Sequence, residues 1–252
     1  MRRLTLRLAV AVLTFAAGTG ASAVYFLRRA PEPHVAPVEL IVGASVDEAV
    51  TPSCFPGRAV PLAETEGRGR WRYFPRGSFD PKPEREKFLV EWYEKYLAAM
   101  GESALSVRRE EPAEVYRFLW LRSFHNPMAV RVWRTSEGRF ISVKELRFKS
   151  FGDNEDADDY KLGKLIADDT RPLRAEEWDE FTRLLEGACY WNLAARRDTD
   201  GEDGARWILE GARDGRYHVV DEWTPQSGAY REACLHLLKL SGLIDVSGKY
   251  VY

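Results

Sequence analysis

The chain has 252 residues, 45% of them hydrophobic and 12% aromatic, which is enough for one sizeable core but short for two full domains and a linker. Its 37 basic and 39 acidic residues give a formal net charge of -2, and this balance excludes the global positive field that draws a protein to nucleic acid or anionic lipid. We therefore expect no nucleic-acid partner, and binding of any polyanion would require a local patch.

A long uncharged run near the N-terminus predicts a membrane segment. Three arginines within residues 2–7 precede the run LAVAVLTFAAGTGASAVYFL at 8–27, and an arginine pair at 28–29 closes it. About 20 apolar residues in a helix span the hydrocarbon core of a bilayer, which is about 30 Å thick. We interpret residues 1–29 as a signal-anchor or transmembrane helix, with the membrane as its partner.

A cleaved signal peptide is the alternative interpretation. Its apolar core would be residues 8–17, and cleavage near Ala23 would release a secreted or periplasmic protein. The anchor is favoured because apolar residues continue to Leu27 and an arginine pair follows, like a stop-transfer signal. More positive charge precedes the run than follows it, so we predict a single-pass protein of the inner (cytoplasmic) membrane whose C-terminal domain is periplasmic or extracellular.

Residues 30–83 hold most of the prolines, in stretches such as APEPHVAP and FPRGSFDPKP, and we interpret them as a Pro-rich tether that spaces a domain from the membrane. Aromatic residues become frequent from about Trp71 onward. We expect that last part of the tether to lie on the domain.

Residues 84–252 are predicted to form a single α+β domain. Apolar residues at three- and four-residue spacing predict a helix from Glu84 to a cap at Gly101, and further helices over 175–187 and 229–240. Between the first two helices, the runs AEVYRFLWLRSF, MAVRVWRT and RFISVKELRF predict an antiparallel β-meander. We expect an antiparallel sheet with about three helices packed on one face, preceded by the N-terminal helix.

Three cysteines, Cys54, Cys189 and Cys234, allow one disulfide outside the cytoplasm. We favour the pair Cys189–Cys234 because both lie in apolar stretches. The alternative is that these two remain reduced and buried as small hydrophobic side chains.

The stretch DGARWILEGARDGRYHVVDEW at 203–223 predicts a β-hairpin with a glycine at its tip. A two-residue turn at Asp214-Gly215 would place Arg213 opposite Arg216 and split the apolar residues between the two faces. A three-residue loop at 213–215 gathers them on one face, so we prefer that register. The apolar face then consists of Trp207, Leu209, Tyr217, Val219 and Trp223.

The same hairpin carries the candidate catalytic residues Glu210, His218 and Glu222. In the preferred register Glu210 lies opposite His218 and Arg206 lies opposite Glu222, which predicts a solvated ladder of cross-strand pairs. We therefore assign no catalytic residue and keep these three only as candidates. Asp221 points toward the apolar face in this register, so it should find a buried partner or lie at the sheet margin.

No cofactor or metal is expected. None of the histidines, which include His125 and His236, has another ligand at a recognised metal spacing, and His236 with Glu232 is interpreted as a helix-surface pair. The acidic stretch DNEDADDY lacks the glycine and bidentate glutamate of a calcium loop, so we interpret it as a surface loop with at most a weak cation site. Its candidate ligands are Asp153, Glu155, Asp156, Asp158 and Asp159.

Aromatic stacking platforms for sugar or peptide are a further alternative. Trp71, Trp120 and Trp191 are the candidates, but most tryptophans fall at inward positions of the pattern, which favours core packing. An exposed aromatic side chain would change that interpretation for its own patch.

The last 80 residues or so resemble a family of bacterial membrane-anchored or exported proteins of unknown function. The resemblance depends on RAEEWDEFTRLLEGACYWNL and on ARWILEGARDGRYHVVDEWTPQSGAYREACLHLLKLSGL, with the layout helix, aromatic strand, W-x-L-E-G strand, Y-H-x-V strand and closing helix. It implies no activity and no catalytic residue.

Two functions from different classes follow. The favoured one is a membrane-anchored, non-enzymatic interaction or structural module of the bacterial envelope, which meets a protein partner through an exposed face or edge strand. The alternative is an envelope hydrolase with dispersed acid and base residues, with His218 and Glu210 as its first candidates. A contiguous exposed apolar or aromatic patch without a deep polar cleft would support the first, and a concave pocket holding carboxylates or histidines with strongly perturbed ionisation would support the second.

Overall fold

The computed structural model describes residues 54–64, 72–79, 82–110, 112–148, 162–197, 201–243 and 251–252. All of these belong to one structural unit, Thr51–Tyr252. Within these ranges no helix has both the length and the apolar character that crossing a bilayer requires. The predicted membrane segment and the alternative cleavage site lie outside the described residues.

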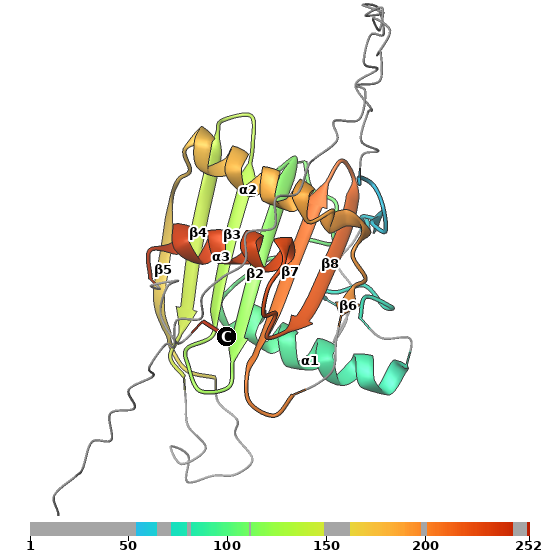
Figure 1. Cartoon of the computed structure of the whole chain (residues 1–252), viewed down its shortest axis with the longest axis vertical. Helices are drawn as coiled ribbons and strands as arrows, with labels where there is room; N and C mark the ends of the chain where they lie inside the picture. Colours follow the sequence, from blue (N-terminus) through green and yellow to red (C-terminus); the bar gives the residue numbers. More distant parts are fainter. Residues whose placement is uncertain are drawn as a thin grey trace, which may run out of the picture. The chain divides into compact units, whose positions relative to one another are not determined.

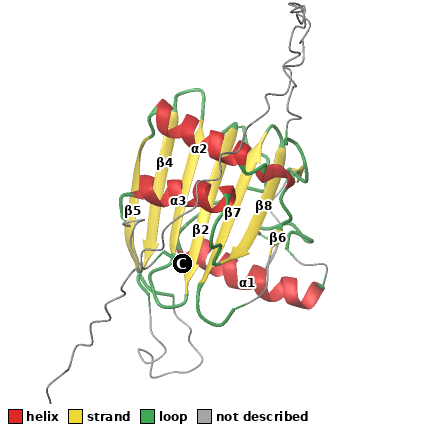
Figure 2. Cartoon of the chain, in the orientation of Figure 1, coloured by secondary structure: helices red, strands yellow, loops and turns green. Residues whose placement is uncertain are grey.

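Eight strands form one sheet in the order β1-β8-β7-β2-β3-β4-β5, with β6 beside β8 (Figures 1 and 2). The β6–β8 pair is parallel, and the other pairs of described strands are antiparallel. The predicted meander is confirmed as β2-β3-β4, and β7 lies on its open side against β2. The strands are β1 (Val60–Pro61), β2 (Glu114–Arg122), β3 (Met128–Arg134), β4 (Arg139–Leu146), β5 (Leu165–Pro172), β6 (Arg196–Arg197), β7 (Ala205–Arg213) and β8 (Arg216–Trp223).

The three predicted helices are confirmed as α1 (Pro83–Ala99), α2 (Ala175–Gly187) and α3 (Ala229–Ser241). Pro83 begins α1, and its missing N–H costs nothing there because the first N–H groups of a helix have no partner within the helix. Gly101 follows the helix with a φ of 64°, a conformation that favours glycine. A short 3-10 helix, Tyr190–Asn192, follows α2.

The prediction that about three helices share one face is wrong for α1. Helices α2 and α3 cover one face of the sheet, and α1 lies against the other, as Figure 1 shows. The reason is that the central strands are buried on both sides, since all nine residues of β2 are buried and β7 is buried over nearly its whole length. A strand with two buried faces needs cover on both.

Alternate side chains of the central strands pack into two separate hydrophobic cores, one on each face of the sheet. Phe118, Trp120 and Trp207 face α2 and α3, whereas Leu119 and Ile208 face α1. Trp120 is fully buried and Trp191 nearly so, which confirms core packing for these two candidates for stacking platforms; Trp71 lies outside the described residues.

Residues 54–64 and 72–79, which the sequence assigns to the tether, are part of this folded unit. Strand β1 pairs with β8, and Tyr73, Phe74 and Phe79 are buried beside α1. Acidic side chains of α1 accept the backbone N–H groups of this segment: Glu94 from Tyr73 at 2.7 Å and Glu86 from Phe79 at 3.1 Å. These bonds satisfy backbone donors that no strand partner reaches.

The disulfide joins Cys54 to Cys189, with 5.3 Å between their Cα atoms, so the preferred pair Cys189–Cys234 is wrong. Cys234 is a free thiol buried on α3, in the core between that helix and the sheet. Cys189 instead follows α2, where the backbone N–H of Arg58 donates to the Trp191 carbonyl at 2.6 Å and holds the segment of Cys54 nearby. The apolar sequence around Cys189 and Cys234 therefore did not indicate the disulfide partner of Cys189.

Reduction should destabilise the protein through this one bond. Because it closes a loop with a sequence separation of 135 residues, we expect reductant to lower the free energy of unfolding by about 2–4 kcal/mol. Urea denaturation with and without reductant measures the change. Cys54→Ser should have the lower free energy of unfolding even without reductant, and reductant should not lower it further. Cys234→Ala should remain sensitive to reductant. A wild-type urea midpoint that reductant leaves unchanged would contradict the disulfide assignment.

Candidate functional site

The β7–β8 hairpin has a two-residue turn at Asp214-Gly215, and the preferred three-residue loop is wrong. Both turn residues have positive φ, 49° and 71°, and Arg213 lies opposite Arg216. This is the turn geometry that suits a right-handed twist between two strands. Splitting the apolar residues between faces is favourable here because each face of the hairpin has its own core.

This register separates the candidate catalytic residues. Glu210 lies opposite Val219 and His218 opposite Gly211, so Glu210 and His218 project from opposite faces of the sheet. The predicted solvated ladder is also wrong, since Glu210 is 0% exposed and His218 5%. Glu222 lies opposite Trp207, not Arg206, and pairs with Arg197 at 3.1 Å.

Glu210 is held in a buried ion cluster on the α1 side of the sheet. Arg117 donates from Nη2 at 2.6 Å and from Nε at 2.8 Å to the same carboxylate oxygen, and the Tyr217 hydroxyl donates to the other at 3.0 Å. Arg117 also donates to Glu102 at 3.2 Å and to the Ser103 carbonyl at 2.6 Å. With both oxygens engaged, this carboxylate is built to hold the strands and not to receive a substrate proton.

Burial and charge act in opposite directions on the two acids of this cluster. Burial raises the pKa of Glu210, against the lowering effect of Arg117. Burial also opposes ionisation of Glu102, but the adjacent cations Arg117, Arg131 and Lys144 hold its pKa below the ordinary value. Glu102 is therefore an anion shared among three cations, a feature that no local sequence pattern indicated.

Asp221 has the buried partners that its predicted inward position required. The Tyr93 hydroxyl of α1 donates to it at 2.9 Å, and Arg206 and Arg196 lie 3.4 Å and 3.5 Å away. Tyr93 thereby joins α1 to β8 through a fully buried carboxylate. This cluster also positions the sheet end that carries Trp223.

The histidines of the described chain serve packing and hydrogen bonding. His218 contacts the Leu193 carbonyl through Nε2 at 3.1 Å, His125 contacts the Tyr252 hydroxyl at 2.8 Å, and His236 contacts the Glu177 carbonyl at 3.3 Å. The described residues hold no group of three His, Cys, Asp or Glu side chains that could bind a metal. The acidic loop with Asp153, Glu155, Asp156, Asp158 and Asp159 lies outside them.

A groove lined by aromatic side chains is the candidate functional site, and we call it the aromatic groove. Phe88 and Phe124 are 64% and 60% exposed, and both line this hollow of about 480 Å³. It lies between α1 and the strand ends at Arg122 and Trp223. The other aromatic residues that line it are Trp92, Tyr96, Phe148 and Trp223.

Charged groups edge the aromatic groove and stiffen its walls. The Arg206 guanidinium lies 5.0 Å from the centre of the Trp223 ring, and both residues line the groove. Such a cation–π contact holds the Trp223 ring in place. Glu202 and Asp203 supply acidic groups along the same groove, so its edge carries both signs of charge.

The outer face of α1 extends this surface. A second hollow, of about 460 Å³, is lined by Phe88, Glu91, Trp92 and Lys95, and it shares Phe88 and Trp92 with the aromatic groove. Phe88 and Trp92 are one helical turn apart, with ring centres separated by 6.2 Å. The apolar spacing of this segment predicts the helix but not which of its residues stay uncovered, which is why the sequence did not indicate this site.

No protein-family model, curated protein or solved structure matches the chain. The family resemblance of its last 80 residues or so therefore stays a prediction.

Removing the charge of Glu210 should leave the buried Arg117 with Glu102, a carboxylate that Arg131 and Lys144 also contact. We expect Glu210→Gln to lower the free energy of unfolding by about 3–5 kcal/mol, whereas Arg117→Met/Glu210→Met should recover most of it because no buried charge is left unpaired. Urea denaturation measures both. Glu180→Gln, in an exposed pair with Arg183, is the matched control and should show no measurable loss. A double variant as unstable as Glu210→Gln would contradict this explanation.

His218 should make the protein acid-sensitive. Burial lowers its pKa from 6.5 to about 4, so the folded state favours the neutral imidazole. The contribution of neutral His218 to the free energy of unfolding is complete above pH 6.5 and is lost as the pH falls toward 4. Between about pH 7.5 and about pH 4.5, wild type should lose about 2–3 kcal/mol more than His218→Gln, as followed by urea denaturation at each pH. Equal losses in the two proteins would show that His218 is not the sensitive group.

Proposed function

We propose that this protein is an exported, membrane-anchored module of the bacterial envelope that binds a partner protein and carries out no catalysis of its own. The uncharged run at 8–27 supports the anchor, and the Cys54–Cys189 disulfide supports a location outside the reducing cytoplasm. The aromatic groove supports the binding role. The resemblance to bacterial exported proteins points to the same compartment.

The observation that carries the proposal is that Phe88 and Phe124, the most exposed large hydrophobic side chains among the described residues, line a single groove. Large apolar side chains left in water in one contiguous patch are typical of interaction surfaces. Aromatic residues and arginine are also the types that dominate the energetic centres of protein interfaces.

The shape of this surface favours an extended protein segment as the occupant. The aromatic groove continues along α1 into the second hollow, so a ligand could follow the helix from Arg85 toward Lys95. A segment with apolar side chains would cover Phe88, Trp92 and Phe124, while charged side chains beside them meet the mixed charges of the edge. We therefore assign the groove to an apolar segment of another envelope protein.

The hydrolase alternative has less support. Its first candidate pair, His218 and Glu210, projects from opposite faces of the sheet, and each side chain is satisfied by structural partners. Neither lines the aromatic groove. A binding module needs no such catalytic pair, only an exposed surface that contacts the partner.

Site-specific photo-crosslinking in living cells tests the proposal. Phe88 or Phe124 is replaced by a benzophenone amino acid, and Leu165 on the edge strand β5, which is also exposed, is the matched control position. We expect one discrete adduct from both groove positions, mapped to a single segment of one envelope protein, and none from position 165.

A groove substitution then shows whether the adduct reports binding. Trp92→Ala should lower the adduct yield from position 124 by roughly tenfold, because truncation of a buried interface aromatic costs at least that in affinity. Circular dichroism and the intact disulfide verify that the variant is folded. Identical adducts from position 165, or a yield that Trp92→Ala leaves unchanged, would refute the groove as the binding surface.

A further inference from the structure

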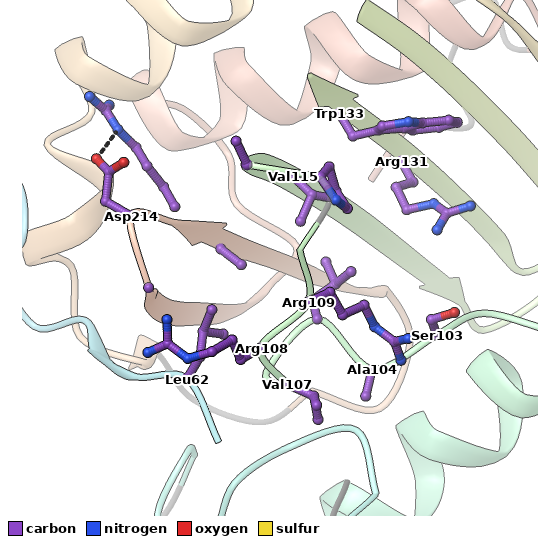
Figure 3. A pocket seen from close by; sticks show the side chains of 16 residues that line it. Leu62, Ser103, Ala104, Val107, Arg108, Arg109, Val115, Arg131, Trp133 and Asp214 are labelled. Carbon is purple, nitrogen blue, oxygen red and sulfur yellow. Dashed lines mark hydrogen bonds and ion pairs between the residues drawn. The ribbon is translucent and has the colours of Figure 1, made fainter. Parts of the chain in front are cut away.

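A third hollow, with different chemistry, lies at the other end of the sheet face that α1 covers. The aromatic groove is at the strand ends near Arg122 and Arg206, whereas this hollow is at the ends near Val115 and Arg213, on the same strands β2 and β7. Its remaining walls are the segment that follows α1 and the tip of the β7–β8 hairpin, as Figure 3 shows. We call it the arginine hollow.

Four arginines line the arginine hollow, against one acid, Asp214. They come from three parts of the fold: two from the segment after α1 and one each from β3 and β7. Figure 3 labels those of the first two parts. In a chain with a formal net charge of -2, this is the local basic patch that anion binding requires. The arginines are Arg108, Arg109, Arg131 and Arg213.

Most of the acids that pair with these arginines lie outside the lining; the exception is Asp214, whose carboxylate accepts from Arg213 Nε at 3.2 Å. Arg108 pairs with Glu64 at 3.0 Å, Arg131 with Glu102 at 3.4 Å, and Arg213 approaches Glu114 at 4.0 Å. None of these three glutamates lines the hollow. The lining therefore carries more positive than negative charge, because the acids of Arg108 and Arg131 lie outside it.

Arg131 is the least compensated of the described arginines in this lining. Its acid, Glu102, also faces Arg117 and Lys144, and its buried Nε makes no hydrogen bond among the described residues. Burial and the charge of Arg117 lower the pKa of Arg131, against the opposing effect of Glu102. Its guanidinium lies 4.8 Å from the ring centre of Trp133, which fixes its position in the wall.

Most of the remaining lining is apolar, which favours an anion that carries an apolar group. Leu62, Val107, Val115 and Ala212 provide hydrocarbon surface beside the guanidinium groups. The volume, about 430 Å³, is in the range of pockets that hold small molecules. A ligand that fills it would combine an anionic group with a short apolar body.

We propose that the arginine hollow binds the phosphate group of a small organic phosphate whose apolar body lies against these walls. A phosphate offers more acceptor oxygens than a carboxylate, so it can accept from more than one guanidinium group, and the planar guanidinium fork matches its geometry. A free alkyl phosphate and a phospholipid headgroup share this chemistry. The site is independent of the aromatic groove and does not require the proposed partner protein.

Isothermal titration calorimetry on the full chain in neutral detergent micelles tests the proposal. Three probes are titrated: inorganic phosphate, n-butyl phosphate, and dihexanoyl phosphatidylglycerol. We expect saturable binding of n-butyl phosphate, of the short lipid, or of both, and binding of inorganic phosphate roughly tenfold weaker because it lacks an apolar body. Preference between the two organic probes distinguishes a free phosphate ester from a lipid headgroup as the source.

Variants connect the binding to the named side chains. Arg109→Gln, on the exposed segment, and Arg131→Gln, in the wall, should each weaken binding by roughly tenfold, because each removes hydrogen bonds between charged groups. Arg183→Gln, which removes the same charge from α2 on the opposite face of the sheet, should leave the affinity unchanged. Arg109→Gln keeps the test valid if Arg131→Gln does not fold.

Three results would overturn the assignment: no saturable binding of either organic probe, an affinity that Arg109→Gln leaves unchanged, or an equal loss in Arg183→Gln. Inorganic phosphate bound as tightly as n-butyl phosphate would overturn the role of the apolar walls. Each of these outcomes leaves the crosslinking test of the aromatic groove unaffected, so the two proposals fail separately.

Discussion

Burial of the central strands β2 and β7 on both faces is the constraint on which the rest of the structure depends. Because side chains alternate along a strand, half of each strand must be covered by α2 and α3 and half by α1. The α1 side receives charged as well as apolar side chains, Arg117 and Glu210 among them. They are stable there only because they pair with each other, since a single buried charge is far more costly than a satisfied pair.

These buried pairs also account for where the two proposed binding surfaces lie. The clusters around Glu210 and Asp221 bind the middle of the sheet to α1 and to the segment after it, and they leave the two strand ends of that face for other uses. One end presents aromatic rings on the exposed side of α1, and the other presents guanidinium groups over an apolar wall. A protein segment and a small anion would thus bind to one face of the sheet without competing for the same side chains.

Much of the fold followed from local pattern, but the candidate site did not. The spacing of apolar residues located α1, α2 and α3, and turn residues separated β2, β3 and β4. Strand β5 was missed because it is a polar edge strand, exposed along most of its length, with no apolar alternation to reveal it. The exposure of Phe88 could not be predicted, because a spacing of three or four residues says that side chains share a face of the helix and not whether that face is covered.

The sequence by itself determined the helices, the meander and the existence of the hairpin, because periodicity and turn chemistry act between residues close in the chain. Only the tertiary structure decided the hairpin register, the partner of Cys189 and the fate of the ionisable groups. The physical reason is the same in each case. The two-residue turn of the hairpin is favourable because both faces of the sheet are covered. The disulfide depends on contacts between residues 54–58 and the segment that follows α2, and the buried carboxylate of β8 depends on contacts with α1. No local pattern encodes that these segments are close in space.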